Sequence, residues 1–129
     1  MLLKKSKLLT DREHLGRWGE KRCEKFLKRK GLKTLTRNFS CKTGELDLVM
    51  VDTDSTIVFV EVRTKAGSDF ATPEDSITAP KKTRLLRTAR YFLATNNIQV
   101  RPYRFDIVAI VLDKSARPDI KHYKNAFTP

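Results

Sequence analysis

Hydrophobic residues recur at helical spacing in two parts of this chain. The first stripe of apolar side chains predicts a helix from about Asp11 to Lys30, which Gly31 ends as a glycine just beyond the last turn. The second stripe predicts a helix that begins near Pro80 and ends near Asn96, because proline is well tolerated in a first helical turn. Each stripe needs an apolar partner layer to cover it.

Strand patterns fill most of the remaining chain. Residues 32–40 alternate roughly between polar and apolar and predict an edge strand. Gly44 to Val51 and Thr56 to Thr64 are almost continuously apolar and are joined by a short polar turn, so they predict a hairpin of central strands. Tyr103 to Leu112 predicts another buried strand, and the tail from Asp119 predicts a last short one.

This order of elements predicts a single α/β domain over residues 11–129, with an αβββαβ core and a mixed central sheet flanked by helices. Residues 1–10 are rich in lysine and are expected to form a flexible basic arm. No apolar stretch approaches the ~20 residues of a membrane span, so no membrane partner is expected. Cys23 and Cys41 lack the spacing of a zinc site or a disulfide framework, which predicts free thiols and a cytoplasmic protein.

The charge balance points to a polyanionic partner. Lys and Arg number 27 against 15 Asp and Glu, which gives a formal net charge of +12. No acid occurs between Ser76 and Phe105, where the second helix is predicted. Five cations on that helix are candidates for contacts with a nucleic-acid backbone: Lys81, Lys82, Arg84, Arg87 and Arg90. The alternative is a solvated basic face that only keeps the protein in solution.

Two acids interrupt the apolar strands of the predicted hairpin. Asp47 lies in the middle of one run and Glu61 in the middle of the next. An unpaired acid in an apolar strand costs several kcal/mol of desolvation, so each must have a partner. A shared Mg²⁺ is one solution, because this cation binds oxygen ligands and needs only one or two carboxylates. Structural ion pairs, Asp47 with Arg63 or Glu61 with Lys65, are the other.

Strand alternation gathers further polar residues around these acids. Glu45 shares one face of its strand with Asp47, and Arg63 and Lys65 share one face of the next strand with Glu61. If the register brings the two faces together, the five side chains form one polar cluster. Such a cluster suits phosphodiester hydrolysis, in which a cation neutralises developing charge and activates water.

Several longer strings extend this pattern along the chain: Gly16-Arg17-Trp18-Gly19-Glu20, Arg37-Asn38-Phe39, Gly44-Glu45-Leu46-Asp47, Val58-Phe59-Val60-Glu61-Val62-Arg63, Arg104-Phe105-Asp106-Ile107-Val108 and Asn125-Ala126-Phe127. With them the chain resembles the uncharacterised bacterial YraN-like family of the PD-(D/E)XK nuclease superfamily. The superfamily includes restriction enzymes, RecB-type nucleases and archaeal Holliday-junction resolvases. The resemblance covers nearly the whole chain.

The resemblance implies a restriction-endonuclease-like fold and Mg²⁺- or Mn²⁺-dependent hydrolysis of DNA. Asp47 and Glu61 would be the metal ligands, and Glu20 matches an acid that some resolvase-like members bring from the first helix. Glu20 or Glu45 would assist the metal ligands. The resolvase members imply a branched or junction DNA substrate, and a two-fold symmetric junction would favour a homodimer.

Arg63 departs from the superfamily pattern, in which a lysine occupies this position. A buried lysine can lose its proton and act as a base, whereas an arginine effectively cannot. Arg63 can still bind phosphate through its guanidinium fork, and Lys65 offers an ammonium on the same face. The departure leaves open a noncatalytic nucleic-acid-binding protein with a nuclease-like fold. A small basic interaction protein on a ribonucleoprotein particle is a third alternative.

Overall fold

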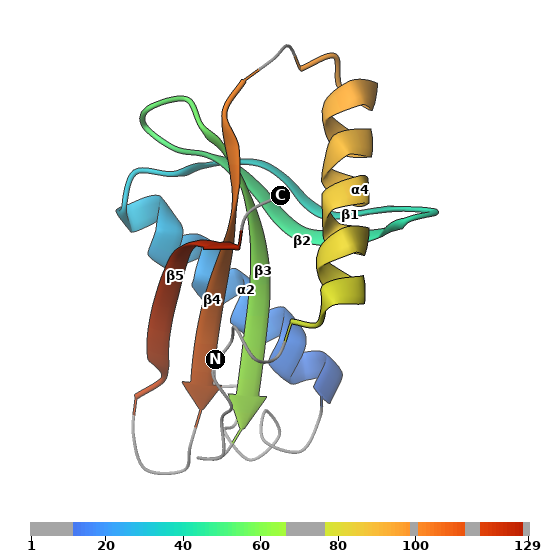
Figure 1. The fold of residues 1–129 in the computed structure, drawn as a ribbon. Coiled ribbons are helices and arrows are strands. Elements are labelled where there is room, and N and C mark those ends of the chain that lie inside the picture. Colours follow the sequence, from blue (N-terminus) through green and yellow to red (C-terminus); the bar gives the residue numbers. More distant parts are fainter. Residues whose placement is uncertain (1–11, 67–76, 99–100, 113–116, 128–129) are drawn as a thin grey trace.

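The computed structural model describes residues 12–66, 77–98, 101–112 and 117–127 and contains every predicted helix and strand (Figure 1). The elements follow in the order α2 (Arg12–Arg29), β1 (Lys33–Cys41), β2 (Gly44–Val51), β3 (Ile57–Ala66), α4 (Ala79–Thr95), β4 (Tyr103–Leu112) and β5 (Asp119–Phe127). The α/β class is confirmed, and the last strand is longer than predicted. The expected basic arm lies outside the described residues, as do residues 67–76 of the polar segment before α4.

The five strands form one mixed sheet in the order β1-β2-β3-β4-β5. All neighbours are antiparallel except β3 and β4, which are parallel. A parallel pair needs a crossover connection, and α4 lies between these two strands in the sequence. The prediction that β2 and β3 are inner strands is confirmed.

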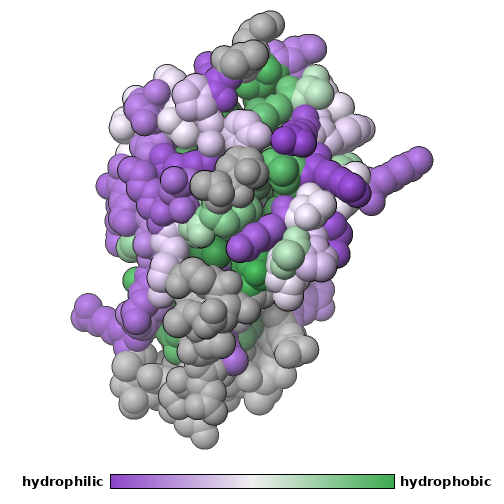
Figure 2. Space-filling view, in the orientation of Figure 1, coloured by the Kyte–Doolittle hydropathy of each residue, from purple (hydrophilic) through white to green (hydrophobic). Residues whose placement is uncertain are grey.

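The two helices cover opposite faces of the sheet. On one face, Cys23 and Leu27 of α2 pack with Val108 of β4, and on the other Leu85 of α4 packs with Ile107. Figure 1 shows α2 crossing behind β3 and β4, whereas α4 lies to the right of β3, next to β1 and β2. In the same view, hydrophobic side chains show as a strip with hydrophilic side chains on both flanks (Figure 2). Neither described helix is both long enough and apolar enough to cross a membrane.

Local signals set the helix ends. Gly31 has φ +99°, a backbone conformation that favours glycine. Its N–H donates to Lys28 O and the N–H of Leu32 donates to Leu27 O, which together form a Schellman motif. At the start of α4, Thr78 is the N-cap and its hydroxyl accepts a hydrogen bond from the N–H of Lys81. This cap fixes where the first turn of α4 begins.

The β1–β2 hairpin is strongly twisted. Phe39 pairs with Leu46, and both contact the α4 layer. Two residues away, Arg37 pairs with Leu48, and these contact the α2 layer. In a flat hairpin the two pairs would share one face, so the strands turn sharply between them. Asp47 lies at this turn, with a helix on either side.

One buried acid is held by a structural network. Asp106 is fully buried and accepts hydrogen bonds from Arg104 Nε at 3.0 Å, from the backbone N–H of Asn125 at 2.9 Å, and from the ring of His122 at 2.8 Å. Arg104 also pairs with Asp52 at 3.0 Å. These contacts give Asp106 and His122 a role in joining β4 to β5.

Candidate active site

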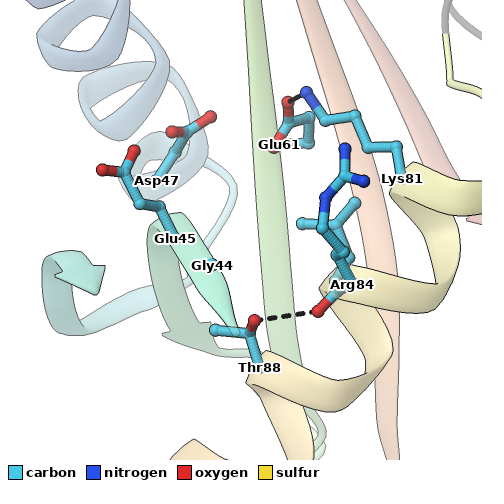
Figure 3. A pocket seen from close by; sticks show the side chains of 8 residues that line it. Gly44, Glu45, Asp47, Glu61, Lys81, Arg84 and Thr88 are labelled. Atoms are coloured by element: carbon cyan, nitrogen blue, oxygen red, sulfur yellow. Dashed lines mark hydrogen bonds and ion pairs between the residues drawn. The ribbon is translucent and has the colours of Figure 1, made fainter. Parts of the chain in front are cut away.

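A hollow of about 220 Å³ opens between β2, β3 and the first turns of α4. Its lining combines acids from the strands with cations from the helix: Gly44, Glu45, Asp47, Glu61, Lys81, Arg84, Leu85 and Thr88. Glu45 and Asp47 extend from β2 on one side, and Lys81 and Arg84 reach in from α4 on the other (Figure 3). The structure thus brings three of the predicted acids to one cavity.

Asp47 occupies the place where β2 and β3 separate. The strand register ends at Leu48 paired with Val60. Beyond that pair, Oδ2 of Asp47 accepts a hydrogen bond of 2.8 Å from the backbone N–H of Val62. The Asp47 side chain therefore accepts the hydrogen bond from a backbone N–H that a neighbouring strand would otherwise accept.

The Asp47 carboxyl holds a proton unusually well. Burial, followed by the negative charge of Glu61, raises the pKa of Asp47 to about 7, although the Val62 N–H and Lys81 act in the opposite direction. Near neutral pH this group is poised between its two protonation states. A cation bound in place of the proton would likewise offset the cost of burying the Asp47 charge and its repulsion by Glu61.

Glu61 pairs with a residue that the sequence pattern did not connect to it. Lys81 Nζ lies 2.8 Å from Oε2 of Glu61, and Arg63 Nε lies 3.8 Å from the same oxygen. The Glu61 side chain is 11% exposed, so this pairing compensates a largely desolvated charge. Lys81 was expected only as a contact to the nucleic-acid backbone, and the docking of α4 makes it a neighbour of the acids.

A second hollow of about 270 Å³ lies on the α2 side of Asp47. It is lined by Arg17, Glu20, Lys21, Glu24, Arg37, Asn38, Asp47 and Leu48. Glu20 is therefore near Asp47 but outside the hollow that contains Glu61. Burial raises the pKa of Glu20, a side-chain hydrogen bond from Asn38 opposes this, and the charges of Glu45 and Glu61 reinforce it. The four acids thus share one electrostatic environment.

The remaining predicted residues are more dispersed. Neither hollow is lined by Arg63 or by Lys65, which is exposed. Arg87 and Arg90 are exposed further along α4. Lys82 lies 5.7 Å from the centre of the Phe127 ring, next to β5. Only Lys81 and Arg84 of the five predicted cations line the hollow with the acids.

The oxygen donors of the hollow suit a hard divalent cation that keeps part of its hydration shell. Among the described residues, no group of three or more His, Cys, Asp or Glu side chains is arranged to hold a metal ion. Mg²⁺ commonly uses only one or two carboxylates, together with waters and substrate phosphate oxygens. Asp47 and Glu61 fit that requirement, provided that Glu61 exchanges Lys81 for the cation.

Comparison with known proteins finds similar chains in several organisms. The sequence profile described as "Uncharacterised protein family UPF0102" matches residues 19–110. A UPF0102 protein of Pelotomaculum thermopropionicum is 40% identical over 90% of this chain and 97% of its own length. Others from Cupriavidus taiwanensis and Ectopseudomonas mendocina are 44% and 42% identical, over 85% and 92% of this chain and 83% and 98% of their own lengths.

Proposed function

The chain belongs to the uncharacterised protein family UPF0102, and we propose that it is a metal-dependent nuclease that hydrolyses DNA phosphodiester bonds in the hollow between β2, β3 and α4. The observation that carries the proposal is the meeting of Asp47, Glu61 and Lys81 in one cavity. The net charge of +12 supports a polyanionic substrate. The resemblance to the PD-(D/E)XK superfamily supports the same chemistry.

In this proposal Asp47 and Glu61 hold Mg²⁺ or Mn²⁺. The bound cation supplies charge neutralisation at the phosphoryl oxygens and a lowered pKa for an attacking water. Glu45 lines the same cavity and Glu20 lies on the other side of Asp47, so each can accept hydrogen bonds from ordered waters. Arg84 lines the cavity opposite the acids and is placed to bind a substrate phosphate.

Lys81 supplies the function that Arg63 cannot. The Lys81 ammonium is only partly exposed and can donate hydrogen bonds to a phosphate oxygen or to an attacking water. With a metal ion held by Asp47 and Glu61, Lys81 would be within reach of a substrate phosphate in the same cavity. Arg63, 3.8 Å from Glu61, then holds that carboxylate in position. The departure from the superfamily pattern at residue 63 is thus compensated from α4.

Cleavage of labelled single-stranded, duplex, flap and four-way-junction DNA with Mg²⁺ or Mn²⁺ tests the proposal. We expect the wild type to cleave at least one substrate, and Asp47→Asn, Glu61→Gln and Lys81→Met each to lower the rate by at least 100-fold while DNA binding remains. Matched exposed positions on β5, Asp119→Asn and Lys124→Met, should retain full activity. Equal rates for Asp47→Asn and Asp119→Asn would reject Asp47 as a metal ligand.

A noncatalytic nucleic-acid-binding protein is the second candidate. The observation in its favour is the ion pair between Lys81 and Glu61, in which a side chain of the protein itself neutralises the acid. This reading expects charge reversal at Arg84 and Arg87 to abolish DNA binding, whereas Asp47→Ala leaves every function intact. Cleavage that depends on Asp47 and on a divalent cation would exclude it.

A further inference from the structure

The α4 face that lines the hollow continues beyond it along the β1–β2 hairpin. One turn past Arg84, the hydroxyl of Thr88 lies 3.0 Å from that of Thr43 in the hairpin. In the following turn the Tyr91 ring lies 6.2 Å from the Phe39 ring, centre to centre, with the planes tilted by 38°. The helix and the hairpin therefore form one continuous surface that leads away from the acids.

Tyr91 is unusual on this surface because its side chain is not covered. It is 49% exposed, and of the described residues only it and Leu35 are large hydrophobic side chains classed as exposed. Phe39 supports the ring from one side, so the ring is held in position while much of it remains open. An aromatic ring with an accessible face is what a stacked nucleic-acid base requires.

Cations accompany the ring along the helix. Arg84, Arg87 and Tyr91 follow one another at intervals of three and four residues, so they lie on one side of α4. Both arginines are exposed. An aromatic ring beside a row of exposed guanidinium groups matches the way proteins bind single-stranded nucleic acid, with cations on the backbone and rings on the bases.

We propose that Tyr91 stacks an unpaired base of a DNA strand whose backbone follows Arg84 and Arg87 into the hollow. One part of this proposal, that the strand leads into the hollow, rests on the proposed nuclease function. Arg84 and Tyr91 are separated by seven residues, or ~10 Å along the helix axis. That length corresponds to about three nucleotides at the 3.4 Å spacing of a stacked strand. A base inside a duplex has both faces covered, so the substrate carries a single-stranded stretch about three nucleotides from the phosphate that Arg84 binds.

Binding in EDTA tests the stacking without any cleavage. Fluorescence anisotropy would compare a labelled single-stranded oligonucleotide with the matching duplex, for the wild type, Tyr91→Ala and Tyr91→Phe. We expect Tyr91→Ala to weaken single-strand binding by about tenfold to a hundredfold, the usual effect of losing one stacked base. Tyr91→Phe keeps the ring and should bind like the wild type, and duplex binding should be unchanged in both variants.

Leu35→Ala is the matched control, because Leu35 is 47% exposed on β1 but has no ring. It should leave single-strand binding unaltered. Oligonucleotides with 2-aminopurine at successive positions give a direct readout, because its fluorescence is quenched when it stacks. We expect one position to be quenched by the wild type and by Tyr91→Phe but not by Tyr91→Ala. Unchanged single-strand affinity in Tyr91→Ala, or an equal loss for single strand and duplex, overturns the proposal.

The same variants separate this proposal from the nuclease proposal. Stacking that depends on Tyr91 in a protein that never cleaves DNA would sustain the binding surface and reject the nuclease. The opposite result would be metal-dependent cleavage by the wild type, with both single-strand binding and cleavage unchanged in Tyr91→Ala. It would sustain the nuclease proposal and reject the stacking surface.

Discussion

Replacing Asp47 by asparagine should stabilise the metal-free protein at neutral pH. The folded protein raises the pKa of this carboxyl from 3.8 to about 7. Between these values the unfolded chain releases the proton and the folded protein keeps it, so the wild type loses stability as the pH rises through this range. Asparagine has no charge to desolvate, and its side-chain oxygen can still accept the hydrogen bond from the Val62 N–H.

The magnitude follows from the size of the pKa shift. A rise of about three pKa units corresponds to ~4 kcal/mol at full strength, at 1.36 kcal/mol per unit. Asp47 lines an open hollow, and solvent screening reduces the effect, so we expect about 2 kcal/mol. For a domain of 129 residues this is a rise in Tm of about 6–10 °C.

Thermal unfolding in EDTA at pH 4, 5.5 and 7.5 measures the effect. The stability difference between Asp47→Asn and the wild type should be small at pH 4 and largest at pH 7.5, with Asp119→Asn as the control on an exposed strand position. Mg²⁺ added in excess over the EDTA should then raise the Tm of the wild type more than that of Asp47→Asn, because binding to the folded state stabilises it. The reasoning would be refuted if Asp47→Asn and the wild type were equally stable at pH 7.5, or if their stabilities differed by the same amount at every pH.

Two further predictions concern the scaffold around the site. A Cβ at Gly19 would collide with the Thr64 side chain on β3, whereas one at Gly16 would meet nothing, so Gly19→Ala should cost about 1–3 kcal/mol while Gly16→Ala gains up to ~1 kcal/mol. Urea unfolding of both variants checks this, and equal stabilities would contradict it. Asp106→Ala would leave the buried guanidinium of Arg104 poorly compensated and should cost about 3–5 kcal/mol in the same assay. A loss below 1 kcal/mol would show that Asp52 alone suffices for this arginine.

The elements of this fold were predictable because local periodicity determines them. The strands Gly44–Val51 and Tyr103–Leu112 have the predicted bounds, and alternation correctly placed Glu45 with Asp47 on the strand that lines the hollow. The same reasoning identified Glu61 on the neighbouring strand. Each of these inferences depends only on residues close together in the sequence.

Contacts between distant segments could not be predicted in this way. Lys81 meets Glu61 because α4 docks with a particular rotation, and no local pattern of residues encodes that rotation. The contact between Tyr91 and Phe39 likewise joins residues that are far apart in the sequence. The change of face along the β1–β2 hairpin, where Asn38 has φ +50°, is also not encoded in the alternation of residues.

The hydrogen bond between Val62 and Asp47 links the backbone of the sheet to the ionisation of the site. The N–H of Val62 has a side-chain acceptor in place of a strand partner, so its protection from exchange with solvent deuterium reports on that carboxylate. Loss of the proton strengthens the acceptor, and a ligand that draws the carboxylate away exposes the amide. A single backbone amide in the middle of β3 therefore acts as a spectroscopic reporter of events in the hollow.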